Sequence, residues 1–127
     1  MGKVMVIDTS ALLAIVFHEE KGSSIQERLD QEEGLLLMST VNLTEFLILI
    51  RSRLTVGYDQ VYEKILTTGI RFIPPTVHHA EVAAKARLQY PLNLGDCFVY
   101  ALAKDENEPI LTLDPDFKKT DAVVIMP

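Results

Sequence analysis

The chain has 127 residues, of which 48% are hydrophobic and 24% charged, and its formal net charge is −6. This length and composition indicate one globular domain, residues 1–127, and exclude a disordered chain. The apolar runs are too short to span a bilayer, and polar residues interrupt the apolar segment near the N-terminus, so we expect neither a membrane span nor a signal peptide. The single cysteine, Cys97, cannot form an internal disulfide, which agrees with a cytosolic protein.

The charges are unevenly distributed along the chain. Residues 1–50 contain three Lys or Arg and eight Asp or Glu, residues 51–90 contain six and three, and residues 91–127 contain three and seven. The acidic net charge argues against a nucleic-acid partner, because affinity for phosphates comes mainly from Lys and Arg. A basic middle between acidic ends suits a protein that holds a metal beside phosphates, although solvated helix faces are the commoner cause of such a pattern.

Strands and helices are predicted to alternate along the chain. The apolar run 4–7 is typical of a strand buried on both faces. The predicted helices are 11–17, 22–33, 41–54, 58–68, 77–87 and 94–107, and the further predicted strands are 35–38, 71–73, 110–113 and 122–126. Two prolines follow the strand 71–73, which indicates a sheet edge. Right-handed crossovers then give a three-layer α/β/α fold, with helices on both faces of a parallel five-strand sheet.

Asp8 directly follows the first predicted strand. Ligand sites in open α/β sheets lie just beyond the carboxyl ends of such strands, so Asp8 is a candidate ligand. Asp8, Thr9 and Ser10 also suit the N-cap of the next helix, because all three residue types accept hydrogen bonds from its first backbone amides. One arrangement satisfies both interpretations, in which Thr9 or Ser10 caps the helix while Asp8 holds a metal.

Two further acids lie in unusual helical settings. Glu45 lies in an apolar helix stripe, where a carboxylate must either reach solvent or meet a cation. Asp96 begins a helix that is apolar on all sides. The alternative for Asp96 is an ordinary first-turn aspartate that complements the helix dipole.

Asp114 follows the strand 110–113 as Asp8 follows the first strand. If these two strands are the adjacent central pair, both carboxylates lie where the strand order reverses. Thr112 points to the same sheet face as Asp114, where its hydroxyl could bond a metal-bound water. An Asp-Pro turn and an ordinary strand threonine are the alternatives.

Four acids in one pocket would raise one another's pKa values unless a divalent cation neutralised them. Oxygen ligands select Mg²⁺ or Mn²⁺, and the sequence has no His and Cys set with zinc spacing. Such a cluster is suited to phosphodiester hydrolysis by a metal-activated water.

These motifs together resemble a PIN domain, most of all the VapC toxin ribonucleases of VapBC toxin–antitoxin pairs. The resemblance covers the whole chain and rests on Asp8-Thr9-Ser10-Ala11-Leu12, on Glu45, on Gly95-Asp96 opening the helix to Ala103, and on the run from Leu111 to Phe117. It implies a Mg²⁺- or Mn²⁺-dependent endoribonuclease. The implied quartet is Asp8, Glu45, Asp96 and Asp114, with Asp116 as a supplementary acid and Ser10 and Thr112 as polar supports.

The resemblance also implies partners. Members of this family form homodimers and assemble into heterotetramers or larger complexes with an antitoxin. The antitoxin's C-terminal segment crosses the active-site groove and often places a basic side chain among the acids.

The RNA-binding surface is less clear from the sequence. The candidates are Arg51, Arg53, Lys85, Arg87, Lys118 and Lys119, and for each of them a solvated helix or turn position is favoured. His18, His78 and His79 lack metal spacing and are expected at the surface or in N-terminal helix turns. Cys97 is expected in the core.

Two other functional classes remain open. A response-regulator receiver needs an acidic pair after its first strand and a lysine near its fifth, and an aspartate-nucleophile phosphatase would need a second aspartate where Ser10 stands. A non-catalytic PIN-like module that binds RNA or protein is the other class. The intact quartet argues against it.

Overall fold

The computed structural model describes residues 3–32 and 34–127, in which five strands alternate with six α-helices and one 3₁₀-helix. The strands are β1 (Val4–Ile7), β2 (Leu35–Ser39), β3 (Arg71–Ile73), β4 (Ile110–Leu111) and β5 (Val124–Ile125). The helices are α1 (Thr9–Val16), α2 (Glu20–Glu32), α3 (Thr40–Arg53), α4 (Tyr58–Leu66), α5 (Val77–Gln89), α6 (Leu94–Glu106) and the 3₁₀-helix η1 (Pro115–Lys119).

All strand pairs are parallel, and the strand order is β3-β2-β1-β4-β5. The predicted parallel five-strand sheet is therefore confirmed, as is the position of β3 at an edge. β1 pairs with β2 on one side and with β4 on the other, and the order in which the strands are added reverses between β1 and β4. Ligand sites of open parallel sheets form at such a point.

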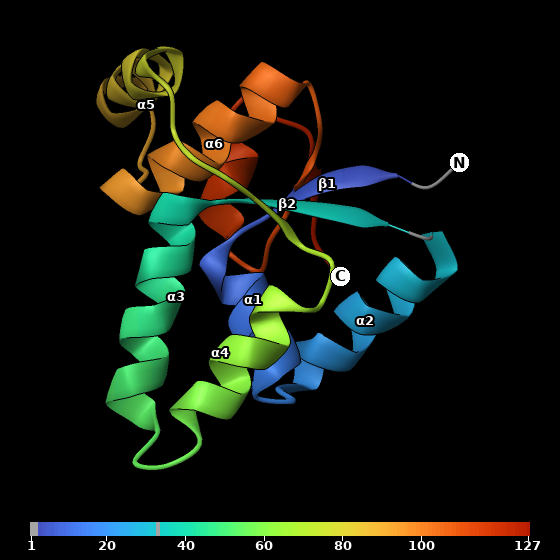
Figure 1. The fold of residues 1–127 in the computed structure, drawn as a ribbon. Coiled ribbons are helices and arrows are strands. Elements are labelled where there is room, and N and C mark those ends of the chain that lie inside the picture. The colour runs from blue at the N-terminus through green and yellow to red at the C-terminus, as the bar shows by residue number, and fades with distance from the viewer. Residues whose placement is uncertain (1–2, 33) are drawn as a thin grey trace.

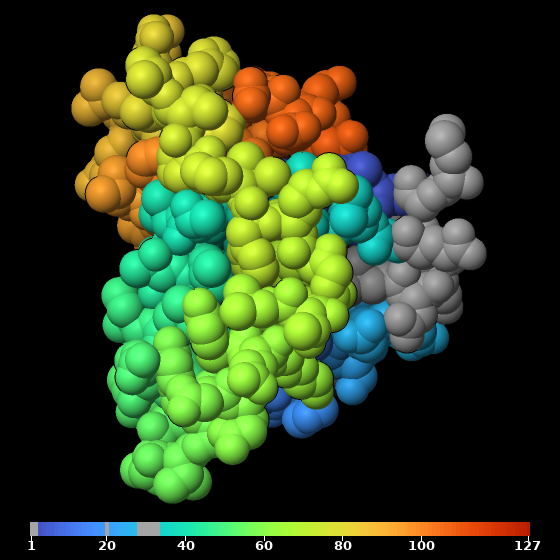
Figure 2. All heavy atoms as spheres, viewed as in Figure 1, coloured from blue at the N-terminus to red at the C-terminus, as the bar shows by residue number. Residues whose placement is uncertain are grey.

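Helices cover both faces of the sheet (Figure 1). Met5 and Ile7 of β1 pack in one core with residues of α1, α2, α3 and α4. Val6 points the opposite way and packs with α5 and α6 in a second core, which contains Cys97 as predicted. This alternation follows from the period of two in a strand, and it explains why β1 is apolar at every position. Figure 2 shows α3 and α4 side by side on one face of the molecule.

Several predicted boundaries were wrong. α2 begins two residues before Gly22, which lies inside the helix, and the predicted end at Glu33 lies outside the described residues. A Cβ atom at Gly22 would overlap the backbone carbonyl of Ala14, so the glycine permits the close approach of α2 to α1. β4 ends at Leu111 because the Thr112 side chain accepts a hydrogen bond from the Asp114 amide and closes a turn. β5 is likewise shorter than predicted.

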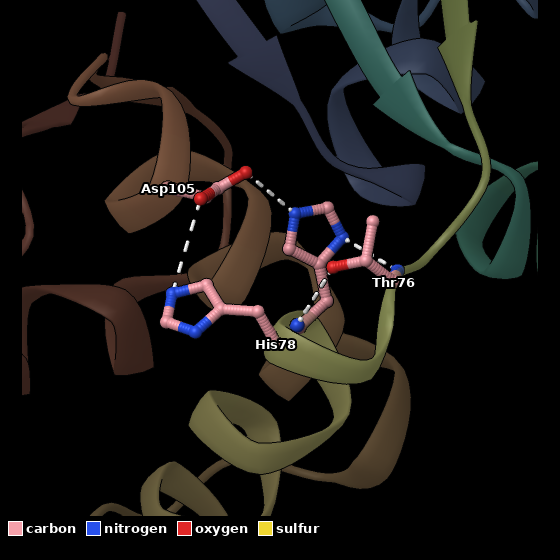
Figure 3. Close-up of polar contacts among 4 residues, drawn as sticks. Thr76, His78 and Asp105 are labelled. Carbon is pink, nitrogen blue, oxygen red and sulfur yellow. Dashed lines mark hydrogen bonds and ion pairs between the residues drawn. The ribbon is translucent and has the colours of Figure 1, made fainter.

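His79 lies in the first turn of α5, as one of the two predicted alternatives had it, but it is only 3% exposed. Its Nδ1 accepts a hydrogen bond from the Thr76 amide at 3.2 Å, while the Thr76 hydroxyl accepts one from the His79 amide at 3.1 Å. Because Nδ1 accepts, the ring proton lies on Nε2, 2.9 Å from Asp105 Oδ2 on α6. Figure 3 shows Thr76, Asp105 and the neighbouring His78 around this link between α5 and α6.

The His79→Ala substitution should lower the free energy of unfolding by about 2–3 kcal/mol, because it leaves buried polar partners without hydrogen bonds and opens a cavity. His78→Ala is the matched control, since His78 is 63% exposed and 3.8 Å from Asp105. We expect its effect to stay within about 0.5 kcal/mol. Equilibrium unfolding in urea measures both values, and equal effects of the two substitutions would contradict the assignment.

Candidate functional site

The Asp8 carboxylate is buried where β1 ends. It accepts hydrogen bonds from Thr112 Oγ1 at 2.6 Å, from Ser10 Oγ at 2.8 Å and from the Ala11 amide at 3.0 Å. Asp8 itself is therefore the N-cap of α1, which confirms one of the predicted alternatives, whereas the arrangement in which Thr9 or Ser10 caps the helix was wrong. Asp8 can cap α1 because its backbone is extended, which lets the Asp8 side chain reach the first backbone amides of the helix.

The hydroxyls of Ser10 and Thr112 connect Asp8 to the end of β4. Ser10 Oγ accepts from the Leu113 amide at 3.1 Å, and Thr112 Oγ1 accepts from the Asp114 amide at 2.9 Å. Each hydroxyl proton is then free to point at Asp8. The structure thus places the Thr112 hydroxyl directly on Asp8, and a bond from Thr112 to a metal-bound water is not needed to explain its position.

Burial raises the pKa of Asp8 above its usual 3.8, and the charge of Asp114 adds to this effect. The hydrogen bonds from Thr112, Ala11 and Ser10 act in the opposite direction because they stabilise the carboxylate. The hydrogen-bond donors therefore favour the ionised form of Asp8, whereas burial and the charge of Asp114 oppose it.

Glu45 lies on α3 and is held by two donors. Its Oε1 accepts from Asn42 Nδ2 at 2.9 Å and from Thr9 Oγ1 at 3.1 Å. The sequence predicted that this carboxylate would reach solvent or meet a cation. Glu45 is partly exposed in the structure, as the first of these alternatives had it, and it also accepts hydrogen bonds from an amide on α3 and a hydroxyl on α1.

Asp96 and Asp114 each lie at the beginning of a helix. The Asn93 side chain caps α6 by accepting from the Asp96 amide at 2.8 Å, and Asp114 caps η1 by accepting from the Asp116 amide at 2.9 Å. Burial raises the pKa of Asp96 from 3.8 to about 7, with further contributions from the charges of Asp114, Asp8 and Glu45. The four predicted acids are therefore close enough to repel one another.

All four acids line one hollow of about 230 Å³. Its lining residues are Asp8, Thr9, Ser10, Leu13, Glu45, Leu49, Asn93, Asp96 and Asp114. None of these described residues is a Lys or Arg, so the negative charge has no cationic partner in the lining. Asp116 is not among them, and its carboxylate lies 3.2 Å from Lys119 Nζ.

The donor chemistry of the hollow fits a hard divalent cation, because carboxylate oxygens are the ligands that Mg²⁺ and Mn²⁺ prefer. As the side chains lie, no three Asp, Glu, His or Cys residues in the described part of the chain converge closely enough to hold an ion. Hydrogen bonds to other protein groups hold the Asp8 and Glu45 carboxylates in these positions. A bound cation would have to draw them inward.

Comparison with known proteins identifies the family. Residues 5–123 match the PIN domain model. Ribonuclease VapC30 of Mycobacterium tuberculosis is 34% identical to the chain over 134 residues, which cover 97% of this chain and all of VapC30. Ribonuclease VapC42 of the same organism is 32% identical over 126 residues, covering 92% of this chain and 95% of VapC42. This chain is a PIN-domain protein of the VapC ribonuclease family.

Solved structures of VapC proteins share the fold. The Sarcin-Ricin loop cleaving toxin VapC20 of Mycobacterium tuberculosis superposes with a TM-score of 0.79 at 19% identity, and the match covers 97% of this chain and 99% of VapC20. DNA-bound VapBC from Salmonella typhimurium gives a TM-score of 0.76 at 15% identity, with 99% and 98% covered. The resemblance to PIN domains that the motifs indicated is thus confirmed.

Three polar residues in or beside the PIN-domain hollow were not predicted as site residues: Thr9 and Asn93 line it, and Asn42 is buried behind Glu45. Asn42 and Thr9 bind Glu45, and Asn93 caps the helix that carries Asp96. Asn42 had a detectable signal, because it stands three residues before Glu45 and therefore on the same helix face. The contact of Thr9 with Glu45 joins residues 36 positions apart, and no local pattern indicates it.

The predicted RNA-binding residues lie outside the hollow. The Arg51 guanidinium is 3.8 Å from the centroid of the Tyr58 ring. Arg53 lies 5.4 Å from the Phe17 centroid and 3.8 Å from Glu19 Oε1. The remaining candidates are exposed on α5 and η1: Lys85, Arg87, Lys118 and Lys119.

The pH dependence of stability tests the repulsion at Asp96. The folded protein keeps the Asp96 proton up to a pKa of about 7, whereas the unfolded chain releases it near 3.8, so the folded state binds more protons between these values. The stability of the protein in EDTA should therefore fall as the pH rises through this window, and the raised pKa of Asp8 acts with the same sign. Asp96→Asn should make the profile flatter, as measured by urea unfolding at several pH values. Identical profiles for the two proteins would contradict the assignment.

Proposed function

We propose that this PIN domain is a Mg²⁺- or Mn²⁺-dependent endoribonuclease and that residues 1–127 form one nuclease unit. The observation that carries the proposal is the arrival of four carboxylates from four elements at one hollow that no Lys or Arg among the described residues lines. Such uncompensated charge is costly for stability, which indicates a site built for a cationic ligand. The names of the ribonuclease relatives supply the substrate class.

Each group of residues at the hollow has a separate role in this proposal. Asp8, Glu45, Asp96 and Asp114 hold the cation, which when bound activates a water, orients the scissile phosphate and stabilises the leaving oxygen. Ser10 and Thr112 keep the Asp8 carboxylate oriented through their hydrogen bonds. Asp116 remains a supplementary acid in this proposal, although it does not line the hollow and its carboxylate lies 3.2 Å from Lys119 Nζ.

We propose two partners for this protein, an RNA substrate and an antitoxin. Arg51 and Arg53 lie at the far end of α3 from Glu45, and with Lys85, Arg87, Lys118 and Lys119 they are our candidates for contacts with RNA phosphates. The protein partner is an antitoxin, because solved neighbours of the fold include toxin–antitoxin complexes. A basic antitoxin side chain among the four acids would inhibit the enzyme. A homodimer, joined by antitoxins into a heterotetramer or larger assembly, is part of the same proposal.

A non-catalytic PIN-like module that binds RNA or protein is the second candidate. One observation favours it, which is that no three acids in the described residues converge on a metal position. The two candidates differ in whether cleavage occurs when a divalent cation is supplied.

Asp96→Asn is the sharper test of catalysis. Asp8→Asn should also abolish cleavage, but its amide group would face three hydrogen-bond donors and disturb the fold. Asp96 instead carries a charge that its surroundings oppose, so the neutral Asn should be tolerated. Without one ligand to the cation, we expect RNA cleavage to fall about 100-fold or more.

The assay follows cleavage of labelled RNA with Mn²⁺ or Mg²⁺ and with EDTA. Glu106→Gln is the matched control, because it neutralises an exposed acid at the other end of α6. Undiminished cleavage by both Asp8→Asn and Asp96→Asn would refute the proposal. RNA binding by the wild type without cleavage in either metal would establish the non-catalytic alternative.

A further inference from the structure

Among the residues that the structure describes, hydrogen bonds reach one oxygen of the Glu45 carboxylate. Oε1 accepts hydrogen bonds from Asn42 and Thr9, whereas Oε2 accepts none from the residues that the structure describes. The two donors come from different helices, and Thr9 directly follows Asp8. The position of the Glu45 carboxylate is thus set by neighbours of the acidic quartet.

The Asn42 side chain also reaches the helix that carries Asp96. Asn42 is 1% exposed, and its Nδ2 donates to the Gly95 carbonyl at 3.0 Å as well as to Glu45. Both partners are acceptors, so the amide group cannot be turned over without losing both bonds. Figure 1 shows the start of α6 beside the start of α3, where this contact lies.

The orientation of Asn42 has a cost. Its Oδ1 is buried without a hydrogen-bond partner in the described part of the chain. An unpaired buried acceptor lowers stability by about 1–3 kcal/mol. Stability alone therefore does not explain an asparagine here, and a function of its amide group does.

Gly95 makes room for the carboxylate that Asn42 holds. A Cβ atom at Gly95 would overlap Glu45 Oε2. Glu45 therefore lies directly against the backbone of the residue before Asp96. An alanine at position 95 would push away the flexible end of Glu45. Gly95 is the second residue of α6, where a change from glycine to alanine does not oppose helix formation.

We propose that Asn42 is a positioning residue of the nuclease site and that Gly95 is the gap that it requires. Asn42 holds Glu45 Oε1 against the first turn of α6 and thereby leaves Oε2 as the oxygen available to a divalent cation opposite Asp96. The inference rests on the proposed function for its activity readout. The placement of Glu45 can also be tested without any activity.

Three variants separate positioning from a structural role. Asn42→Ala removes the side-chain amide, and Asn42→Asp keeps the size of the side chain but removes the hydrogen-bond donor. Gly95→Ala displaces the Glu45 carboxylate without opposing the formation of α6. Thr44→Ala is the control, because Thr44 is exposed on the same helix and bonds only to the Thr40 carbonyl. The readouts are Mn²⁺ affinity by calorimetry, kcat and KM for RNA cleavage, and the free energy of unfolding.

We expect each of the three variants to weaken Mn²⁺ binding by about tenfold and to lower kcat more than it changes KM. In a Glu45→Gln background the same substitutions should cause no further loss, because their effect passes through Glu45. Gly95→Ala should keep the wild-type free energy of unfolding. Thr44→Ala should change none of these values.

Additive losses in the Glu45→Gln background, or wild-type Mn²⁺ affinity in a folded Asn42→Ala variant, would overturn the proposal. If Asn42→Ala does not fold, Gly95→Ala decides by the same criteria. If the wild type neither binds Mn²⁺ nor cleaves RNA, the proposed function fails, and a crystal structure of Gly95→Ala or Asn42→Asp still tests the placement. A displaced Glu45 carboxylate supports the inference and an unmoved one overturns it.

Discussion

The hydrogen bonds around Asp8 are the interaction on which the site depends. They join the end of β1 to the end of β4 through the Ser10 and Thr112 hydroxyls, and they start α1 through the Ala11 amide. A buried carboxylate needs several donors to remain charged, because desolvation opposes its ionisation. The same donors that stabilise Asp8 therefore also fix the two central strand ends between which the hollow forms.

The other three acids of the hollow repel Asp8 and one another, whereas the hydrogen bonds to Asp8 stabilise it. Each comes from a helix start or from the first turns of a helix, and the charges of Asp114, Asp8 and Glu45 all raise the pKa of Asp96. A fold selected only for stability would place a Lys or Arg among them. The described lining of the hollow contains neither, so the repulsion among the carboxylates is not offset there. In the function that we propose, a bound cation would offset this repulsion at the sheet's switch point.

Two buried side chains, an imidazole and an amide, connect other helices to α6, the helix that carries Asp96. His79 links α5 to α6 through Asp105, with both ring nitrogens bonded. Asn42 links α3 to α6 through the Gly95 carbonyl, while its Oδ1 has no hydrogen-bond partner among the described residues. The polar atoms of the first link are all paired, as is usual in stable cores, and those of the second are not. This difference supports the positioning role that we propose for Asn42.

The sequence by itself determined the α/β architecture, the edge position of β3 and the positions of Asp8 and Asp114 after apolar strands. It could do so because apolar period and crossover handedness are local or topological constraints. It also indicated Glu45 and Asp96, because acids in apolar helices break the local pattern. Only the structure showed that β1 and β4 are neighbours, which brings the two strand ends together. The tertiary structure alone decided which residue caps α1, that Thr9 binds Glu45, that His79 is buried, and that Asp116 pairs with Lys119 away from the hollow. The first three depend on the direction of a side chain or on contacts between distant segments, which periodicity does not encode. Asp116 and Lys119 are only three residues apart, but the turn that joins them was predicted without its 3₁₀ geometry.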